Sequence, residues 1–266
     1  MKRIRHEVRF EYLYGRDAIK RLNKKPVAYL PVGCLERHGD HLPMGLDVLK
    51  AHAICCLCAR KTGGVVYPAH FYSGVHFLPP DLQKRFSLWG NLYTDKTAEL
   101  NLLEIIKGMI AAGAKVIVLY AGHYPDCQIK MINRIASKVN RTGKARVIPF
   151  DELSFFKTGD HAGIWETSLF AYLFPGQVKF NRIGRKNFLD HGWKGKNDPR
   201  KATFAFGRKA VVRICNFLTK KIVESLRLKV VFSHLSKLKI FPCFRPSVFP
   251  WKSFGSRGFS PVILRP

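Results

Sequence analysis

Short apolar runs alternate with segments of helical periodicity along most of the chain. Apolar runs of strand length cover residues 27–33, 65–68, 115–120 and 145–149. Helical patterns cover residues 48–62, 94–112, 127–140, 166–174 and 200–226. Thr94 is a suitable N-cap for the second of these helices. The alternation predicts an α/β fold with a mostly parallel sheet.

The character of the chain changes near its C-terminal end. From residue 229 onward, Phe, Pro, Ser and basic residues are mixed without a clear period, and no Asp or Glu follows Glu224. We therefore expect one domain over residues 1–228 and a basic, poorly ordered tail over 229–266. A tail that adheres to nucleic acid or to a membrane is the functional alternative.

Composition indicates a globular protein, since 47% of the 266 residues are apolar. No apolar run reaches the roughly 18 residues that a membrane span needs. The basic N-terminus is not followed by an apolar stretch of signal-peptide length, so we expect a cytoplasmic protein.

Seven cysteines without a secretory signal argue against a disulfide framework. Cys55 and Cys58 have redox-motif spacing, but their segment is typical of a buried helix with small apolar side chains.

The formal net charge of +28 would normally indicate a polyanion partner. The basic residues are spread along most of the chain, however, which favours a solvated basic surface. We expect weak nonspecific binding of polyanions from such a surface, no specific nucleic-acid partner and no membrane partner.

The segment 36–47 concentrates groups that bind metal ions. Glu36, His38, His41 and Asp47 combine carboxylate and imidazole in a predicted loop after the first strand. Such donors suit zinc, manganese or iron(II), and one carboxylate can bridge two cations about 3.5–4 Å apart. A polar surface loop with accidental histidines is the structural alternative.

Two further segments carry similar groups. His123 follows the apolar run 115–120, and Asp160, His161 and Glu166 precede or begin a predicted helix. Ligands of parallel α/β sheets bind at the carboxyl ends of strands, so the loops at 36–47 and 121–126 can share one crevice. Asp160 and His161 could form an acid/base pair.

Together these segments resemble the creatininase family of metal-dependent amidohydrolases. Residues 30–47, LPVGCLERHGDHLPMGLD, are similar to the family pattern LPxGxxEQHGxHLPxxxD, with Arg37 in place of the usual glutamine. Residues 121–124 stand where members have Asn-Gly-His, and residues 161–168, HAGIWETS, resemble the family's HAGxxETS. A weaker match covers residues 199–207. The resemblance spans roughly residues 10–228.

The resemblance implies a three-layer α/β/α sandwich in one domain and two divalent metal ions (Zn, Mn or Fe) per subunit. The matching ligands are Glu36, His38, Asp47, His123 and Glu166, with Asp47 as the bridge. Creatininase itself has a ligating glutamate at the position of Pro125, so this departure assigns the fifth ligand to Glu166 and argues against creatinine as the substrate. The resemblance also implies a homo-oligomer, a hexamer in the family.

The implied reaction is hydrolysis of a carbon–nitrogen bond in a small-molecule amide. A water activated by two metal ions attacks the carbonyl, and His161, oriented by Asp160, protonates the leaving nitrogen. Tyr124 and His76 are candidates for hydrogen bonds to the substrate, with packing or surface exposure as the alternative. A formamide hydrolase or a peptidase of cofactor biosynthesis is the alternative within hydrolases. From another class, the alternative is a basic polyanion-binding protein with a vestigial metal site.

Overall fold

The structure is a computed structural model that describes residues 7–75, 81, 94–187 and 192–237. The chain divides into two compact units, Met1–Lys229 and Val230–Pro266. The first unit contains the sheet and the residues singled out above. Of the second unit, the structure describes residues 230–237, which are the last residues of the C-terminal helix. Residues 238–266 of the expected tail lie outside the described part.

Four strands and seven α-helices, with three 3₁₀ turns, make up the described chain. In chain order they are η2 (Phe10–Tyr12), α1 (Gly15–Lys24), β1 (Val27–Val32), α2 (Leu46–Thr62), β2 (Val65–Val66), α4 (Asp95–Ala111), β3 (Val116–Ala121), α5 (Asp126–Arg141), β4 (Arg146–Asp151), α6 (Glu152–Phe156), α7 (Ile164–Leu173), η3 (Phe180–Arg182), η4 (Pro199–Lys201) and α8 (Phe204–Lys237). None of the described helices is both long enough and apolar enough to cross a bilayer.

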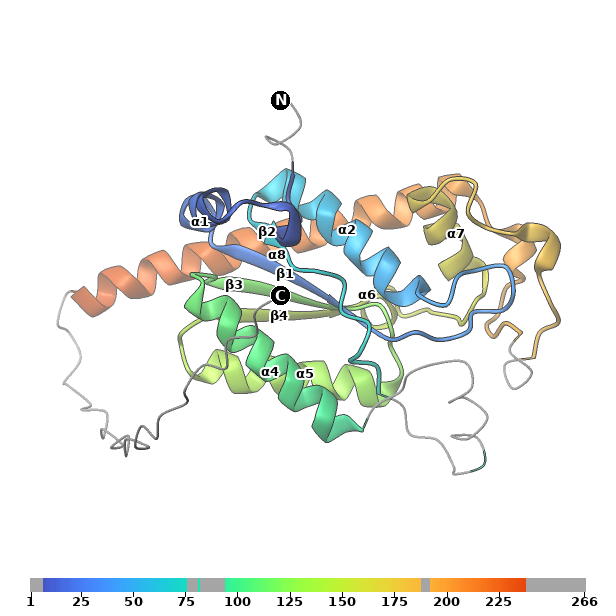
Figure 1. The fold of residues 1–266 in the computed structure, drawn as a ribbon, viewed down its shortest axis with the longest axis horizontal. Coiled ribbons are helices and arrows are strands. Elements are labelled where there is room, and N and C mark those ends of the chain that lie inside the picture. The colour runs from blue at the N-terminus through green and yellow to red at the C-terminus, as the bar shows by residue number, and fades with distance from the viewer. Residues whose placement is uncertain (1–6, 76–80, 82–93, 188–191, 238–266) are drawn as a thin grey trace, which may run out of the picture. The chain divides into compact units, whose positions relative to one another are not determined.

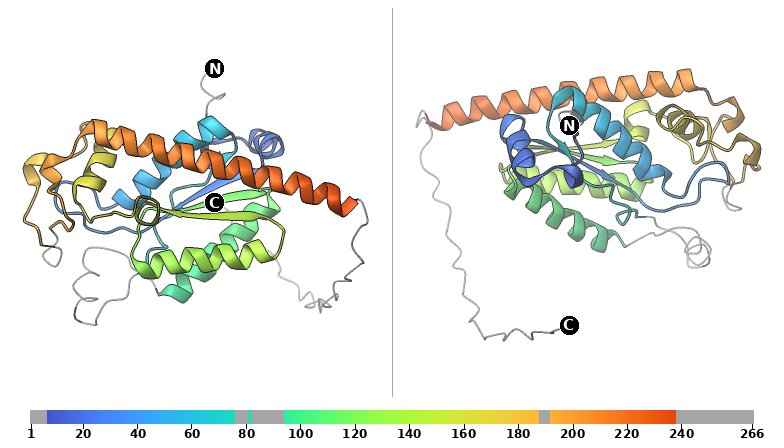
Figure 2. Two further views of the ribbon diagram at one scale, coloured as in Figure 1. Left: turned by 180° about the vertical axis from the view of Figure 1, so that it is seen from behind. Right: turned by 45° about the horizontal axis from the view of Figure 1, so that its top comes forward.

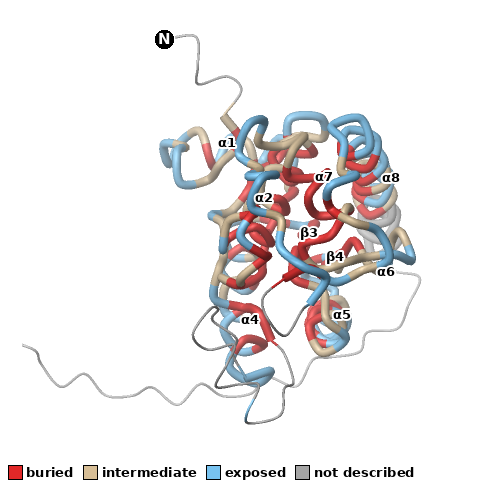
Figure 3. Tube along the Cα trace, turned by 90° about the vertical axis from the view of Figure 1, so that its right-hand side faces the viewer, coloured by how far each residue is buried: buried red, intermediate tan, exposed pale blue. Residues whose placement is uncertain are grey.

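The sheet is fully parallel, with the strand order β2-β1-β3-β4. Successive side chains along each strand point to opposite faces of the sheet and pack into two separate cores. Tyr29, Val118 and Tyr120 pack with residues of α2, α7 and α8. Leu30 and Leu119 pack on the opposite face with residues of α4 and α5. Figures 1 and 2 show the sheet between these two helical layers, and Figure 3 shows the buried strands inside the exposed helical surfaces. The predicted α/β/α sandwich with a parallel sheet is confirmed.

The strand order brings two predicted loops together. From β1 the chain crosses through α2 to β2 on one side, and it later returns to β3 on the other side of β1. The order in which strands are added to the sheet therefore reverses between β1 and β3. These two strands are paired along their whole length up to Val32 and Ala121. Ligands of open α/β sheets bind at such a switch point, outside the carboxyl ends of the strands. The segments that follow β1 and β3 carry three of the candidate donors, Glu36, His38 and His123.

Most predicted elements are present, with shifted ends. Thr94 caps α4 as expected, since its side chain accepts a hydrogen bond from the N–H of Thr97. The helix expected from residue 48 begins at Leu46, because the fully buried Leu46 packs as part of its first turn. Asp47 therefore lies in a helix and not in the loop. The strand expected over 65–68 is reduced to Val65–Val66.

The last predicted helix is also displaced. A 3₁₀ turn capped by Asp198 occupies residues 199–201, and α8 begins at Phe204, where the Thr203 hydroxyl accepts from the N–H of Phe206. The helix continues to Lys237, beyond the expected end at residue 226. Cys55 and Cys58 are buried in α2 among core side chains, as their segment predicts.

Candidate metal centre

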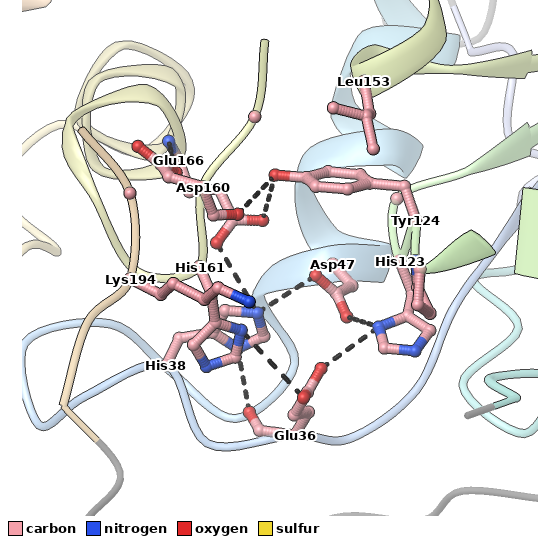
Figure 4. Close-up of a pocket in the computed structure, with 14 residues that line it drawn as sticks. Glu36, His38, Asp47, His123, Tyr124, Leu153, Asp160, His161, Glu166 and Lys194 are labelled. Atoms are coloured by element: carbon pink, nitrogen blue, oxygen red, sulfur yellow. Dashed lines mark hydrogen bonds and ion pairs between the residues drawn. The ribbon is translucent and has the colours of Figure 1, made fainter. Parts of the chain in front are cut away.

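The candidate donors come from four places in the fold and meet in one buried cluster (Figure 4). Glu36 and His38 lie in the segment after β1, and His123 follows β3. Asp47 lies in the first turn of α2, and Glu166 lies in the first turn of α7. All five side chains are buried. The structure thus brings together the residues that the sequence selects from separate segments.

Glycine at position 122 allows this approach. A Cβ atom added to Gly122 would lie 2.0 Å from the carbonyl oxygen of Asp47. Such a contact is far inside van der Waals distance, so any side chain here would push the start of α2 away from the end of β3. Gly33 at the end of β1 is similarly close, with the Cβ of Asp47 3.0 Å from an added Cβ. The two glycines let both strand ends contact the turn that carries Asp47.

Asp47 has the geometry of a bridging carboxylate. Its Oδ1 lies 3.2 Å from Nε2 of His38, and its Oδ2 lies 3.3 Å from Nδ1 of His123. Two groups of metal-ligand type share it, and each has its donor atoms within 4.8 Å of one another. The first consists of Cys34, Glu36, Asp47 and His123, and the second of His38, Asp47 and Glu166. Carboxylate, imidazole and thiol are the donor types that hold zinc and related divalent ions, so these residues fit such a pair.

The tautomer of His38 is fixed by the main chain. Its Nδ1 lies 2.9 Å from the carbonyl oxygen of Glu36. Because a carbonyl oxygen can only accept, Nδ1 carries the proton, and Nε2 is the atom that faces Asp47 and Glu166. A backbone carbonyl that orients the far nitrogen is the usual support of a metal-ligating histidine.

Glu166 uses its two oxygens differently. Oε1 accepts hydrogen bonds from the Lys50 ammonium at 2.8 Å and from the Tyr124 hydroxyl at 2.9 Å. Oε2 accepts from the N–H of Ala162 at 2.8 Å and lies 3.7 Å from Nε2 of His38. Oε1 is therefore held by one ammonium and one hydroxyl, while Oε2 faces His38, another member of the second donor group. This arrangement suits a carboxylate that binds an ion through one oxygen.

The charges of the cluster support one another without an ion. Burial opposes the charged form of His38, but Asp47 and Glu166 raise its pKa to about 9. Burial likewise opposes ionisation of Glu36, but His123 and His161 lower its pKa to about 2. Burial raises the pKa of the Cys34 thiol above its ordinary value. The carboxylates are therefore ionised near neutral pH, as metal ligands must be, and the histidines and the thiol hold protons that a metal ion would displace.

His161 lies over the cluster. Its ring stacks on that of His38, with centroids 4.5 Å apart, and its Nε2 lies 2.8 Å from the carbonyl oxygen of Arg37. The carboxylate of Asp160 accepts hydrogen bonds from the N–H groups of Trp165 and Glu166, at the start of α7. The expected pairing of Asp160 with His161 stays a prediction. Burial lowers the pKa of His161, and nearby His38 lowers it further.

A cavity of about 310 Å³ opens onto the cluster. Besides the donors, Tyr124, Asp160, His161 and Lys194 line it. Lys194 pairs with His161 through two main-chain hydrogen bonds of 2.7 and 2.9 Å, so both side chains leave the same side of this short ladder.

The expected substrate contact His76 lies outside the described residues. His41 faces Thr167 of α7, with its Nε2 3.1 Å from the hydroxyl, and belongs to neither donor group that contains Asp47.

Four residues of the site were not selected from the sequence: Cys34, Lys50, Glu152 and Lys194. Cys34, Glu36 and His38 are spaced two positions apart, and in an extended segment such residues point to the same side, so this spacing is a signal for Cys34. Lys50 follows Asp47 by three positions on α2, which places the two on one face of the helix. Glu152 and Lys194 carry no comparable signal, because only tertiary packing brings them to the site.

Comparison with known proteins identifies the family. The sequence model of the creatininase family, described as creatinine amidohydrolase, matches residues 12–222. The chain belongs to the creatininase family. Membership places the chain among the family's metal-dependent hydrolases of amide C–N bonds. A curated creatinine amidohydrolase of Pseudomonas putida is 29% identical to it over 183 residues, which cover 59% of this chain and 68% of that protein.

Solved structures of creatininases share the fold. A crystal structure of creatinine amidohydrolase aligns with a TM-score of 0.66 at 20% identity, over 82% of this chain and 97% of that chain. A mutant creatininase of Zn-Zn type aligns at 0.63 and 20% identity, over 82% and 98%. A manganese creatininase aligns at 0.62 and 21% identity, over 84% and 98%. These likenesses confirm the creatininase fold that the motifs predict.

Proposed function

We propose that the chain is an amidohydrolase whose site holds two divalent ions bridged by Asp47. Glu36 and His123 would complete one side, and His38 and Glu166 the other. The observation that carries the proposal is that opposite oxygens of Asp47 face ring nitrogens of two different histidines, 3.2 and 3.3 Å away. The zinc and manganese forms of related creatininases support the choice of ions.

Bound there, the ions would lower the pKa of a water toward about 7 and polarise an amide carbonyl. The chain's own groups then have to move protons. The Arg37 carbonyl accepts from Nε2 of His161, so in the neutral ring the lone pair lies on Nδ1, 4.0 Å from Oε1 of Glu36. The lowered pKa of His161 favours this neutral form at pH 7. We propose that His161 takes, at Nδ1, the proton that the attacking water gives up and delivers it to the leaving nitrogen.

Tyr124 has a more specific role under this proposal than a substrate hydrogen bond. Its hydroxyl lies 2.9 Å from both Oε1 of Glu166 and the carbonyl oxygen of Asp160. The hydroxyl is thus engaged in holding Glu166, and the ring is the part that would contact the substrate. The substrate itself would be a small amide, since a cavity of about 310 Å³ is at the small end of ligand pockets.

The substrate class is testable with a panel of cyclic amides, formamides and short peptides. The purified protein would be stripped with a chelator and reloaded with zinc, manganese or iron(II). We expect at least one class to be hydrolysed, with activity abolished by the chelator, restored by one of the ions, and absent from Asp47→Ala. Hydrolysis that survives complete chelation, or no turnover of any class by the loaded protein, would contradict the proposal. Light scattering of the same samples tests the homo-oligomer that the family resemblance implies.

A further inference from the structure

Cys34 lies inside the first donor group, although the family resemblance assigns it no role. It follows β1 and is 0% exposed. Its Sγ lies 3.6 Å from Oδ2 of Asp47 and 3.8 Å from Oε2 of Glu36. These two oxygens are the same ones that face Nδ1 of His123, at 3.3 and 3.1 Å. Four donor atoms of three chemical types therefore surround one point.

The distances between these donors fit a tetrahedral ion. With a Zn–S bond of about 2.3 Å and Zn–O or Zn–N bonds of about 2.1 Å, the sulfur–oxygen edges of a tetrahedron are about 3.6 Å and the nitrogen–oxygen edges about 3.4 Å. The sulfur–oxygen distances in the structure are 3.6 and 3.8 Å, and the nitrogen–oxygen distances are 3.3 and 3.1 Å. Small movements of the side chains would bring all four atoms to ligand distance.

The position of the thiol is fixed from behind. A Cβ atom added to Gly74 would lie 2.4 Å from Cβ and 2.8 Å from Sγ of Cys34. The backbone of Gly74 therefore packs directly against this side chain and leaves it no room on that side. A rigid thiol in contact with two carboxylates differs from a cysteine that merely fills apolar space.

We propose that Cys34 is a thiolate ligand of the ion held by Glu36, Asp47 and His123, and that it makes this subsite selective for zinc over manganese. The inference rests on the proposed two-metal function. Binding forms an S–metal bond and releases the thiol proton to solvent. Thiolate is a soft ligand that favours zinc, whereas manganese prefers oxygen donors. The second donor group, His38, Asp47 and Glu166, offers only nitrogen and oxygen, so the two subsites differ in the ions they prefer.

Cobalt(II) provides a direct readout, because a thiolate ligand gives a near-ultraviolet charge-transfer band that oxygen and nitrogen ligands do not. The chelator-stripped protein would be titrated with cobalt(II), and bound cobalt would be counted by equilibrium dialysis. Cys127→Ser is the matched control, since the Cys127 thiol lies 3.3 Å from the carbonyl of Val75 and belongs to neither group. We expect the band in the native protein and in Cys127→Ser, and its loss in Cys34→Ser.

The outcomes separate the two proposals. Cobalt that binds the native protein without the band overturns ligation by Cys34 and leaves the metal site itself standing. A band that persists in Cys34→Ser also overturns it. Failure of cobalt, zinc and manganese to bind at all overturns both proposals.

Selectivity is a second, independent readout. Loss of even an indirect partner of a metal ligand costs about 10–100-fold in affinity. Cys34→Ser should therefore weaken zinc binding at the first donor group by at least about tenfold and change manganese binding there much less. Equal losses for the two ions would contradict selection by the thiolate. Circular dichroism of Cys34→Ser establishes that any loss occurs in a folded protein.

Discussion

The ammonium of Lys50 lies 2.8 Å from Oε1 of Glu166, and the two side chains are 0% and 2% exposed. The same ammonium lies 3.2 Å from Oε2 of Glu152, which also accepts from the indole N–H of Trp165 at 2.9 Å. A buried lysine thus links a candidate metal ligand to a carboxylate that the proposed chemistry does not use. Its charge balances one carboxylate in the core and orients the other toward the donor group.

Replacing this lysine should destabilise the protein strongly. In Lys50→Met, Glu166 and Glu152 lose their buried cation, and breaking a buried ion pair from one side costs about 3–5 kcal/mol. Urea unfolding of the chelator-stripped protein measures the loss. Adding Glu152→Gln should recover part of it, because one of the unpaired charges is then removed. If Lys50→Met alone is as stable as the native protein, the Lys50 contacts contribute little to stability.

Gly122 should tolerate no side chain. Gly122→Ala places a Cβ against the carbonyl of Asp47, and overpacking of this kind costs about 1–3 kcal/mol. Because the displaced residue is the proposed bridge, bound metal should also fall. Gly108→Ala is the control: Gly108 lies within α4, an added Cβ there meets nothing within 4 Å, and alanine favours helix. Equal metal content in Gly122→Ala and Gly108→Ala would contradict the close approach of β3 and α2.

The stability of the metal-free protein should fall as the pH rises from neutral. The pKa of His38 is about 9 in the folded protein and about 6.5 in an unfolded chain. The folded state therefore binds the proton more tightly, and this contribution is complete below about pH 6.5 and lost as the pH passes about 9. We expect the free energy of unfolding to drop by up to about 3 kcal/mol over this range.

Urea unfolding of the stripped protein across this pH range measures the drop, and His38→Gln should show a smaller one. Bound metal replaces the His38 proton, so metal affinity should rise over the same range as less proton has to be displaced. If the stability of the metal-free protein is constant or increases toward pH 9, protonated His38 is not stabilised by Asp47 and Glu166 as proposed.

His161 should affect turnover and not metal content. His161→Asn removes the proposed proton carrier, and loss of a general acid or base typically costs about 10²–10⁴-fold in rate. The assay is kcat on whichever panel substrate is hydrolysed, with bound metal measured on the same sample. If His161→Asn loses an ion instead, His161 is a ligand with Glu36 and His38, which form a third group of donor type.

The sequence predicts the sheet well because parallel strands are buried on both faces. The runs at β1 and β3 are therefore nearly continuous apolar segments, which also fixes where the loops after them begin. The five-residue helix α6 is too short to show a period, and its start depends on the Asp151 side chain accepting from the N–H of Ser154. The sequence predicts the beginning of α2 two residues too late, because its first turn continues the polar loop and only packing shows that Leu46 is buried.

The candidate site was predictable where donors alternate in an extended segment or follow a strand, as Glu36, His38 and His123 do. Lys50 was not, because a lysine in a helix is ordinarily exposed, and its burial depends on Glu152 and Glu166 from distant segments. Cys34 gives only a weak signal, because cysteine at a strand end commonly fills apolar space.

The measurement that tests the central claim most directly is the metal content of the purified protein and of Asp47→Ala. If Asp47 bridges two ions, the native protein should bind about two equivalents of zinc, manganese or iron, and Asp47→Ala should lose both. Asp40→Ala is the matched control, since Asp40 belongs to the same loop but has a side chain 62% exposed and paired with Arg37. It should retain both ions. A native protein that binds no ion under metal-replete conditions, or an Asp47→Ala variant that binds as many ions as Asp40→Ala, would contradict the account.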